Sequence, residues 1–143
     1  MSYPPREDGF AMLRLPCMLA LLRVTIALMF MAHAVVRLVG GSVERFAGFL
    51  AAKGFPFALA LVLLISAYEI IAGLAIALDR GVRWFAPGLI FIATMGIVLI
   101  HAGNGWFVGE HGSGGMEYSL CLIVALLVLI AHDFERQAQR SRR

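Results

Sequence analysis

The sequence is poor in charged residues. Asp, Glu, Lys and Arg make up only 15% of its 143 residues, whereas apolar residues make up 61%. Soluble domains are usually about half apolar and about a quarter charged, and a small domain leaves much of its surface in water. The low charge therefore excludes an ordinary soluble domain and favours a protein whose solvent is lipid. Because long polar stretches are also missing, we expect one transmembrane domain over residues 1–143.

Cysteine is scarce as well. Cys17 and Cys121 are not spaced as a metal-binding or CxxC motif, so we interpret them as small apolar side chains. The basic residues lie at the ends of apolar runs and not in a patch with interleaved aromatic residues. This distribution argues against nucleic-acid binding and is typical of a membrane protein.

Four apolar runs are long enough, with their flanks, to cross a membrane. They cover about residues 16–38, 57–78, 84–101 and 116–132. Crossing the hydrocarbon takes roughly 20 helical residues, or as few as about 17. The expected fold class is therefore an all-α membrane protein, a four-transmembrane-helix bundle. The polar tail, residues 133–143, is expected to extend the fourth helix on the cytoplasmic side.

A short interfacial helix is expected in the first loop. Ser42 is a candidate N-cap, the segment Gly54–Pro56 would end the helix, and the apolar residues between them recur at helical spacing: Val43, Phe46, Ala47 and Leu50. We expect this helix to lie on the outer surface of the membrane.

Loop charges predict the orientation. Eight arginines lie in the amino-terminal segment, the second loop and the tail, whereas three basic residues lie in the first loop and none in the third. The positive-inside rule then puts both termini in the cytoplasm. Aromatic residues flank the spans at the expected boundaries: Trp84, Phe85, Trp106, Phe107 and Tyr118.

Two ionisable residues stand out deep inside the spans, where such residues are costly and suggest a function. Arg23 is roughly 10 Å from the cytoplasmic start of the first helix and Glu69 roughly 13 Å from the cytoplasmic end of the second, at about 1.5 Å per residue. Their similar depth predicts an Arg23–Glu69 ion pair. The alternatives are that Arg23 reaches the inner headgroups while Glu69 is protonated, or that the two belong to a proton relay.

A second group of polar residues is predicted at the outer face. It comprises His33, Arg37, His101, Glu117 and Tyr118, with Asn104, Glu110 and His111 from the third loop nearby. Such a set could bind a metal or haem, or hydrogen-bond a quinone. The favoured alternative is a polar rim that caps the bundle, so no metal and no tightly bound cofactor is expected, although a quinone remains an option.

The third loop contains six glycines between residues 103 and 115 but no lysine and no P-loop spacing, which argues against nucleotide binding. The sequence also shows no Ser/His/Asp or Cys/His nucleophile arrangement. We therefore do not expect the chain to be an enzyme on its own.

The chain resembles the DoxX family of small bacterial membrane proteins over roughly residues 15–131. The resemblance rests on Arg23 followed by MFMAHAVVRL, on the GFP at 54–56, on YEIIAGLAIALDRG at 68–81 and on GGMEYSL at 114–120. It implies a four-helix fold in the bacterial inner membrane. It also implies a link to redox biology, since relatives are associated with quinol oxidase or thiosulfate:quinone oxidoreductase systems and with oxidant-defence complexes.

The resemblance also bears on individual residues. The positions that match the family's polar motif are Arg23, His33, Glu69 and Glu117. Arg37 stands where relatives often have lysine, which keeps the charge and changes its geometry. Ala34 replaces a glycine that commonly follows the histidine, so a close backbone contact there is in question.

Three functions follow from these expectations. The first is an accessory or structural subunit of a membrane-bound redox complex, with small residues such as Gly73 and Gly88 letting helices pack closely against each other. The second is a quinone- or thiol-linked oxidoreductase site at the outer face that uses His33, His101 and Glu117. The third is a small permease with Arg23 and Glu69 on a polar path.

Overall fold

The computed structural model describes residues 14–109 and 114–142, and these residues form helices and connecting turns without a strand. The helices, in chain order, are α1 (Leu15–Val39), α2 (Val43–Ala52), α3 (Ala58–Ala77), α4 (Val82–Gly96) and α5 (Glu117–Ser141). A π-helical turn (Ile97–His101) and a 3-10 turn (Ala102–Asn104) continue α4. The all-α class predicted from the sequence is confirmed. Residues 1–13, Glu110, His111 and Arg143 lie outside the described part.

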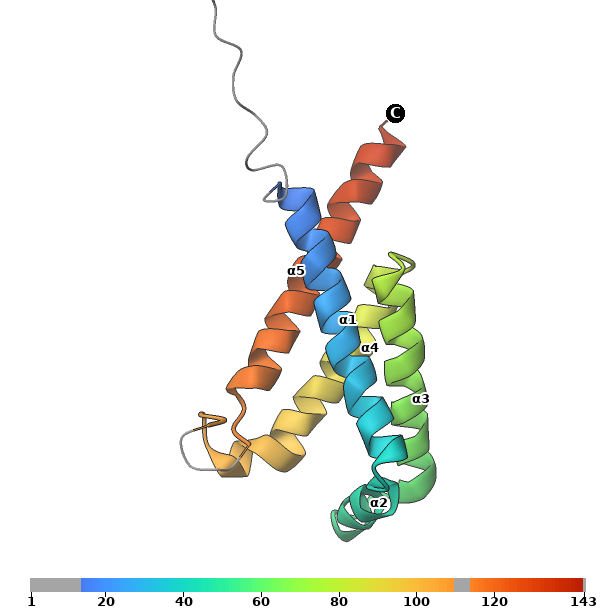
Figure 1. Cartoon of the computed structure of the whole chain (residues 1–143), viewed down its shortest axis with the longest axis vertical. Helices are drawn as coiled ribbons and strands as arrows, with labels where there is room; N and C mark the ends of the chain where they lie inside the picture. Colours follow the sequence, from blue (N-terminus) through green and yellow to red (C-terminus); the bar gives the residue numbers. More distant parts are fainter. Residues whose placement is uncertain (1–13, 110–113, 143) are drawn as a thin grey trace, which may run out of the picture.

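Four segments are long and apolar enough to cross a membrane: α1, α3, α4 with its two turns, and α5. Their bounds agree with the four predicted runs, and α5 continues to Ser141, so the polar tail extends the last helix as expected. The short α2 lies across one end of the bundle, consistent with an interfacial helix (Figure 1). We call this the α2 end. The opposite end, where α1 begins and α3 and α5 end, is the terminus end.

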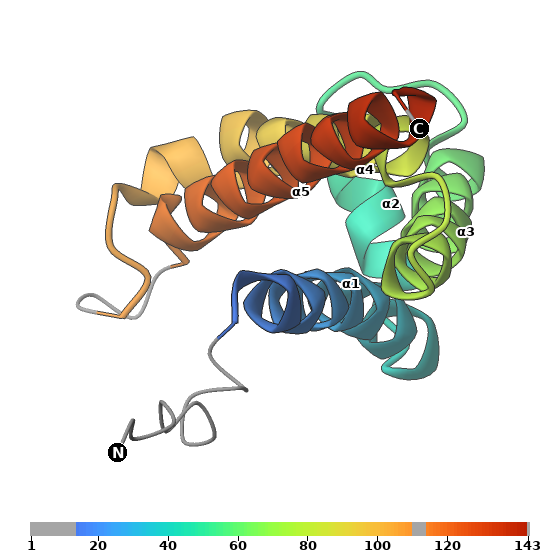
Figure 2. The same ribbon diagram turned by 90° about the horizontal axis from the view of Figure 1, so that it is seen from above.

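The bundle consists of two helix pairs. α1 packs mainly against α3, and α4 mainly against α5, whereas α1 and α5 contact each other more sparsely. The view from above shows α1 apart from α5, with α3 beside α1 and α4 alongside α5 (Figure 2). A central apolar core joins the pairs, with Phe30, Ile76, Leu89 and Leu126 at most 4% exposed.

Two glycines allow the close helix contacts. A Cβ on Gly73 of α3 would collide with Met31 and press on the carbonyl oxygen of Ala27, both in α1. A Cβ on Gly88 of α4 would collide with the ring and hydroxyl of Tyr68 in α3. Gly73 lets the backbones of α1 and α3 approach, as is common between helices in membranes, and Gly88 makes room for the Tyr68 side chain.

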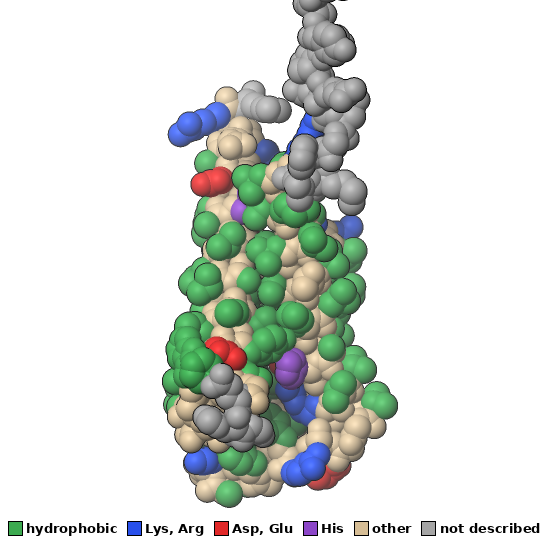
Figure 3. All heavy atoms as spheres, turned by 60° about the vertical axis from the view of Figure 1, so that its left-hand side comes forward, with side chains coloured by type: hydrophobic (Ala, Val, Ile, Leu, Met, Phe, Trp, Pro, Cys, Tyr) green, Lys and Arg blue, Asp and Glu red, His purple; other side chains and the backbone are tan. Residues whose placement is uncertain are grey.

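The outer surface of the four long helices is largely apolar. Exposed side chains include Leu28 in α1, Leu63 in α3, Phe91 in α4 and Val124 in α5. Hydrophobic side chains cover the middle of the face seen in Figure 3, and charged side chains gather towards its two ends. This pattern fits a bundle surrounded by lipid.

Candidate functional site

A buried polar cluster joins α1 and α3 in the half of the bundle nearer α2. Nη1 of Arg37 donates to Oε2 of Glu69 at 2.8 Å and to the Ser66 hydroxyl at 2.9 Å. The Ser66 hydroxyl in turn donates to the carbonyl oxygen of Val62 at 2.9 Å. The side chain of Glu69 is 4% exposed and that of Arg37 is 15% exposed. The Arg37 guanidinium also lies 5.2 Å from the centre of the Phe46 ring of α2, so this cluster ties three helices together.

The predicted Arg23–Glu69 pair is wrong, because each residue has a different partner. Glu69 is paired with Arg37, and Nη1 of Arg23 lies 2.6 Å from Oδ1 of Asp79, in the turn after α3. Both residues are therefore ion-paired, but not with each other.

The register of α1 against α3 explains the exchange. Gly73 lies against Ala27 and Met31, and the two helices are antiparallel. One turn from there towards the α2 end brings Glu69 within reach of Arg37. One turn towards the terminus end brings Arg23 level with the end of α3. A similar depth for Arg23 and Glu69 requires the ends of the two helices to be level, whereas α1 extends beyond α3 at the terminus end (Figure 1).

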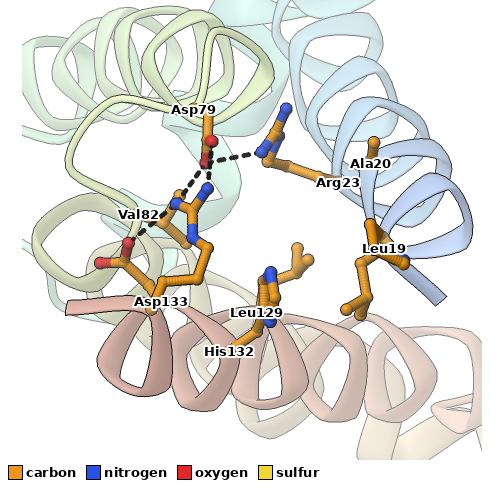
Figure 4. A pocket seen from close by; sticks show the side chains of 10 residues that line it. Leu19, Ala20, Arg23, Asp79, Val82, Leu129, His132 and Asp133 are labelled. Carbon is orange, nitrogen blue, oxygen red and sulfur yellow. Dashed lines mark hydrogen bonds and ion pairs between the residues drawn. The ribbon is translucent and has the colours of Figure 1, made fainter. Parts of the chain in front are cut away.

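A second cluster lies at the terminus end and has Asp79 at its centre (Figure 4). Arg136 of α5 binds the Asp79 carboxylate with two nitrogens, at 2.5 and 2.8 Å, and Arg23 of α1 binds it from the other side. Arg136 also contacts Asp133 one turn earlier in α5, at 3.1 Å. One carboxylate thus links α1, the α3–α4 turn and α5.

The backbone at Asp79 is unusual. Asp79 has a φ of +60°, the left-handed conformation in which glycine is usual after a helix. The backbone N–H of Asp79 donates to the carbonyl oxygen of Ile76, and the backbone N–H of Arg80 donates to the carbonyl oxygen of Ala75. This is the hydrogen-bond pattern of a Schellman motif. Aspartate tolerates this conformation better than most residues, and it supplies a charge that glycine would not.

The surroundings of Asp79 stabilise its charged form. Partial burial alone would raise the pKa of this carboxyl. The hydrogen bond from Arg136 and the charge of Arg23 outweigh burial and hold the pKa of Asp79 below its ordinary value. Asp79 is therefore an anion at neutral pH that holds two arginines from different helices.

Two cavities flank the Asp79–Arg136 pair. A cavity of about 430 Å³ opens between α1 and α5, with apolar walls from Leu19, Val82 and Leu129, and with His132 beside it (Figure 4). A smaller cavity of about 240 Å³ lies on the other side of the pair and is lined mainly by polar side chains of the α3–α4 turn and of α5.

The residues predicted to form an outer-face cluster are divided in the structure. The His33 and Tyr118 rings come together, with centroids 6.4 Å apart, whereas Arg37 turns to Glu69. His101 contacts the carbonyl oxygen of Gly114 at 2.7 Å.

Glu117 accepts a hydrogen bond from the backbone N–H of Val108 at 3.0 Å. His101 and Glu117 therefore hold the loop between α4 and α5. Among residues 14–109 and 114–142, no three His, Cys, Asp or Glu side chains are grouped so as to hold a metal ion.

The terminus-end cluster was missed from the sequence. Asp79 falls between two of the predicted spans, and Asp133 and Arg136 fall in the predicted polar tail. The i, i+3 spacing of Asp133 and Arg136 indicates that they share a helix face. Nothing in the linear pattern shows that this face meets Asp79.

These features define a multi-pass helical membrane protein with ion pairs between its helices. A DoxX family model matches residues 18–102, so the chain belongs to the DoxX family. Comparisons with curated proteins and with solved structures gave no match.

Proposed function

We propose that this chain is an accessory subunit of a membrane-bound redox or electron-transfer complex, without a tightly bound cofactor of its own. The DoxX resemblance implies a redox association. The observation that carries the proposal is that the ionisable side chains between the helices bind one another. Glu69 is bound by Arg37, and Asp79 by Arg23 and Arg136.

Such pairing gives these charges a structural role. Arg37 and Glu69 fix α1 on α3, and Asp79 holds the ends of α1 and α5 to the α3–α4 turn. The apolar outer faces of the helices are left for lipid and for neighbouring subunits, which packing and interhelical hydrogen bonds would hold.

The proposal is tested by purification from native membranes in a mild detergent, followed by mass spectrometry and an optical spectrum. We expect a membrane redox protein to co-purify at a fixed ratio. If α1 and α3 together form the docking face, less of that partner should co-purify with the Glu69→Leu variant in a matched preparation. A monodisperse wild-type protein without a redox partner would refute the proposal.

The proposed location is the inner membrane of a bacterium, with both termini in the cytoplasm. Arg83, Arg136 and Arg140 gather at the terminus end, which supports this orientation by the positive-inside rule. Gly48 on α2 faces open space, so Gly48→Cys is a suitable labelling site, and Ser141→Cys marks the other end.

Both labels should be introduced after replacement of Cys17 and Cys121. A membrane-impermeant maleimide should label the α2 site in intact spheroplasts and the Ser141 site only after permeabilisation. The reverse pattern would invert the topology.

A second candidate is a quinone- or thiol-linked site at the α2 end, and the contact between His33 and Tyr118 favours it. One ring nitrogen of His33, Nδ1, is 3.1 Å from the carbonyl oxygen of Met29. Within the described residues Nε2 makes no hydrogen bond, and His33 is exposed, so it is available to a quinone oxygen.

This candidate is tested by measuring the binding of a short-chain quinone to the purified wild type and to the His33→Ala and His101→Ala variants. Loss of binding in the first variant alone supports it. Equal binding by both variants and the wild type rules it out.

A further inference from the structure

The smaller cavity at the terminus end carries an excess of positive charge. Three arginines line it, Arg83, Arg136 and Arg140, against the two aspartates Asp79 and Asp133. Both carboxylates are already bound by Arg136, and Asp79 is bound by Arg23 as well. The cavity therefore has more cationic groups than its own carboxylates neutralise.

Two of these arginines have no carboxylate partner in the part of the chain that the structure describes. Arg83 donates to the side-chain carbonyl oxygen of Gln137, and Arg140 is exposed. The Nε of Arg136 is buried and makes no hydrogen bond. Unused donors and unpaired guanidinium groups around one cavity favour an anion with several acceptor oxygens, since guanidinium binds phosphate with paired hydrogen bonds.

The position of the cavity indicates where that anion comes from. It lies where α3 ends and α4 begins, at the boundary of the apolar spans. Trp84 is 73% exposed beside it, with the Arg83 guanidinium 5.2 Å from the centre of its ring. Leu78 and Phe134 are exposed nearby. Tryptophan and arginine at the end of a span are typical of the headgroup layer, where lipid phosphates are concentrated.

We propose that this cavity binds the phosphate of an anionic phospholipid, with Arg83, Arg136 and Arg140 as its donors. The site is separate from the redox association proposed above and does not depend on it. The lipid would hold the α3–α4 turn to α5 and supplement the Asp79–Arg136 pair.

The test is native mass spectrometry of the full chain, purified in detergent and mixed with either phosphatidylglycerol or phosphatidylcholine. Arg140→Gln removes one donor without breaking a hydrogen bond that the structure shows. Arg45→Gln, on the exposed side of α2, removes the same charge at the other end and serves as the matched control. Arg140→Lys keeps the charge, and circular dichroism confirms that each variant is folded.

We expect phosphatidylglycerol to be retained over phosphatidylcholine, and Arg140→Gln to weaken its retention roughly fivefold, about the effect of one basic residue at a membrane surface. Arg45→Gln should leave retention unchanged, and Arg140→Lys should restore most of it. Equal retention of the two lipids, or equal losses in Arg45→Gln and Arg140→Gln, would overturn the proposal. If inorganic phosphate displaced phosphatidylglycerol, the ligand of the cavity would be a soluble phosphate and not a lipid.

Discussion

The buried pair of Arg37 and Glu69 permits a quantitative test of the fold. The perturbation is a double-mutant cycle in which Arg37→Met and Glu69→Leu are made singly and together. Methionine retains much of the apolar stem of arginine, and leucine is close in size to glutamate. The cycle therefore removes the charges with little change in packing.

The magnitude follows from the geometry of the pair. Arg37 donates at 2.8 Å to a carboxylate that is 4% exposed, and hydrogen bonds to charged groups contribute about 1.5–3 kcal/mol. Side-chain hydrogen bonds between membrane helices average about 0.6 kcal/mol and reach about 1.7 kcal/mol. We therefore expect a coupling energy of about 2 kcal/mol.

The single variants should each cost about 2–3 kcal/mol, less than the roughly 3–5 kcal/mol typical of a broken buried pair. The cost is smaller because neither remaining partner has to stay in the bundle as an unpaired buried charge. Glu69 takes up a proton when Arg37 is absent, and Arg37, two residues before the end of α1, reaches towards the headgroups when Glu69 is absent.

The assay is unfolding by SDS in mixed micelles, followed by far-ultraviolet circular dichroism. A second cycle with Arg23→Met and Glu69→Leu serves as the control. It should be additive within about 0.5 kcal/mol, as for residues that share no contact. Stronger coupling in the Arg23 cycle than in the Arg37 cycle would refute the register of α1 against α3.

Three further outcomes are expected. Asp79→Asn should lower the free energy of unfolding by about 1 kcal/mol at neutral pH, because the pairs it breaks are partly exposed, as unfolding in mixed micelles would show. Since the folded-state pKa of Asp79 is lowered by Arg136, the stabilisation is complete above the ordinary pKa and is lost as the pH falls through the lowered pKa of the folded state. An acid titration of wild type against Asp79→Asn measures this loss, and parallel curves would contradict it. Gly88→Ala should cost about 1–3 kcal/mol by overpacking against Tyr68, whereas Gly48→Ala, in open space, should not lower the midpoint of thermal unfolding.

The helices were predictable from the sequence because lipid imposes a simple length rule. A run of about 20 apolar residues has to form a helix to satisfy its backbone, and α1, α3 and α5 follow the predicted runs closely. The short α2 was predictable from the spacing of Val43, Ala47 and Leu50, which pack against α3. Ser42 precedes it as expected, but its hydroxyl contacts the carbonyl oxygen of Arg37 and does not cap the helix.

The ion pairs were harder to predict because they depend on how far one helix is shifted along another. That shift is set by side-chain packing, here by Gly73 against Ala27 and Met31. An offset of about two turns corresponds to roughly 11 Å, enough to exchange the partners of Arg23 and Glu69. The sequence indicated which charges lie in the spans, but helix ends alone do not determine which of them meet.

The turn after α3 contains a clue to the terminus-end cluster, namely the aspartate at position 79. The left-handed residue that ends a helix is usually glycine, and here Gly81, the glycine of this turn, comes two residues after that position. An aspartate that occupies it accepts some backbone strain. The compensation is that its carboxylate stands at the point where α1 and α5 converge on the α3–α4 turn, and both arginines reach it from there. Asp79 therefore combines the strained backbone with the central charge. We infer that this position has aspartate and not glycine because of that charge.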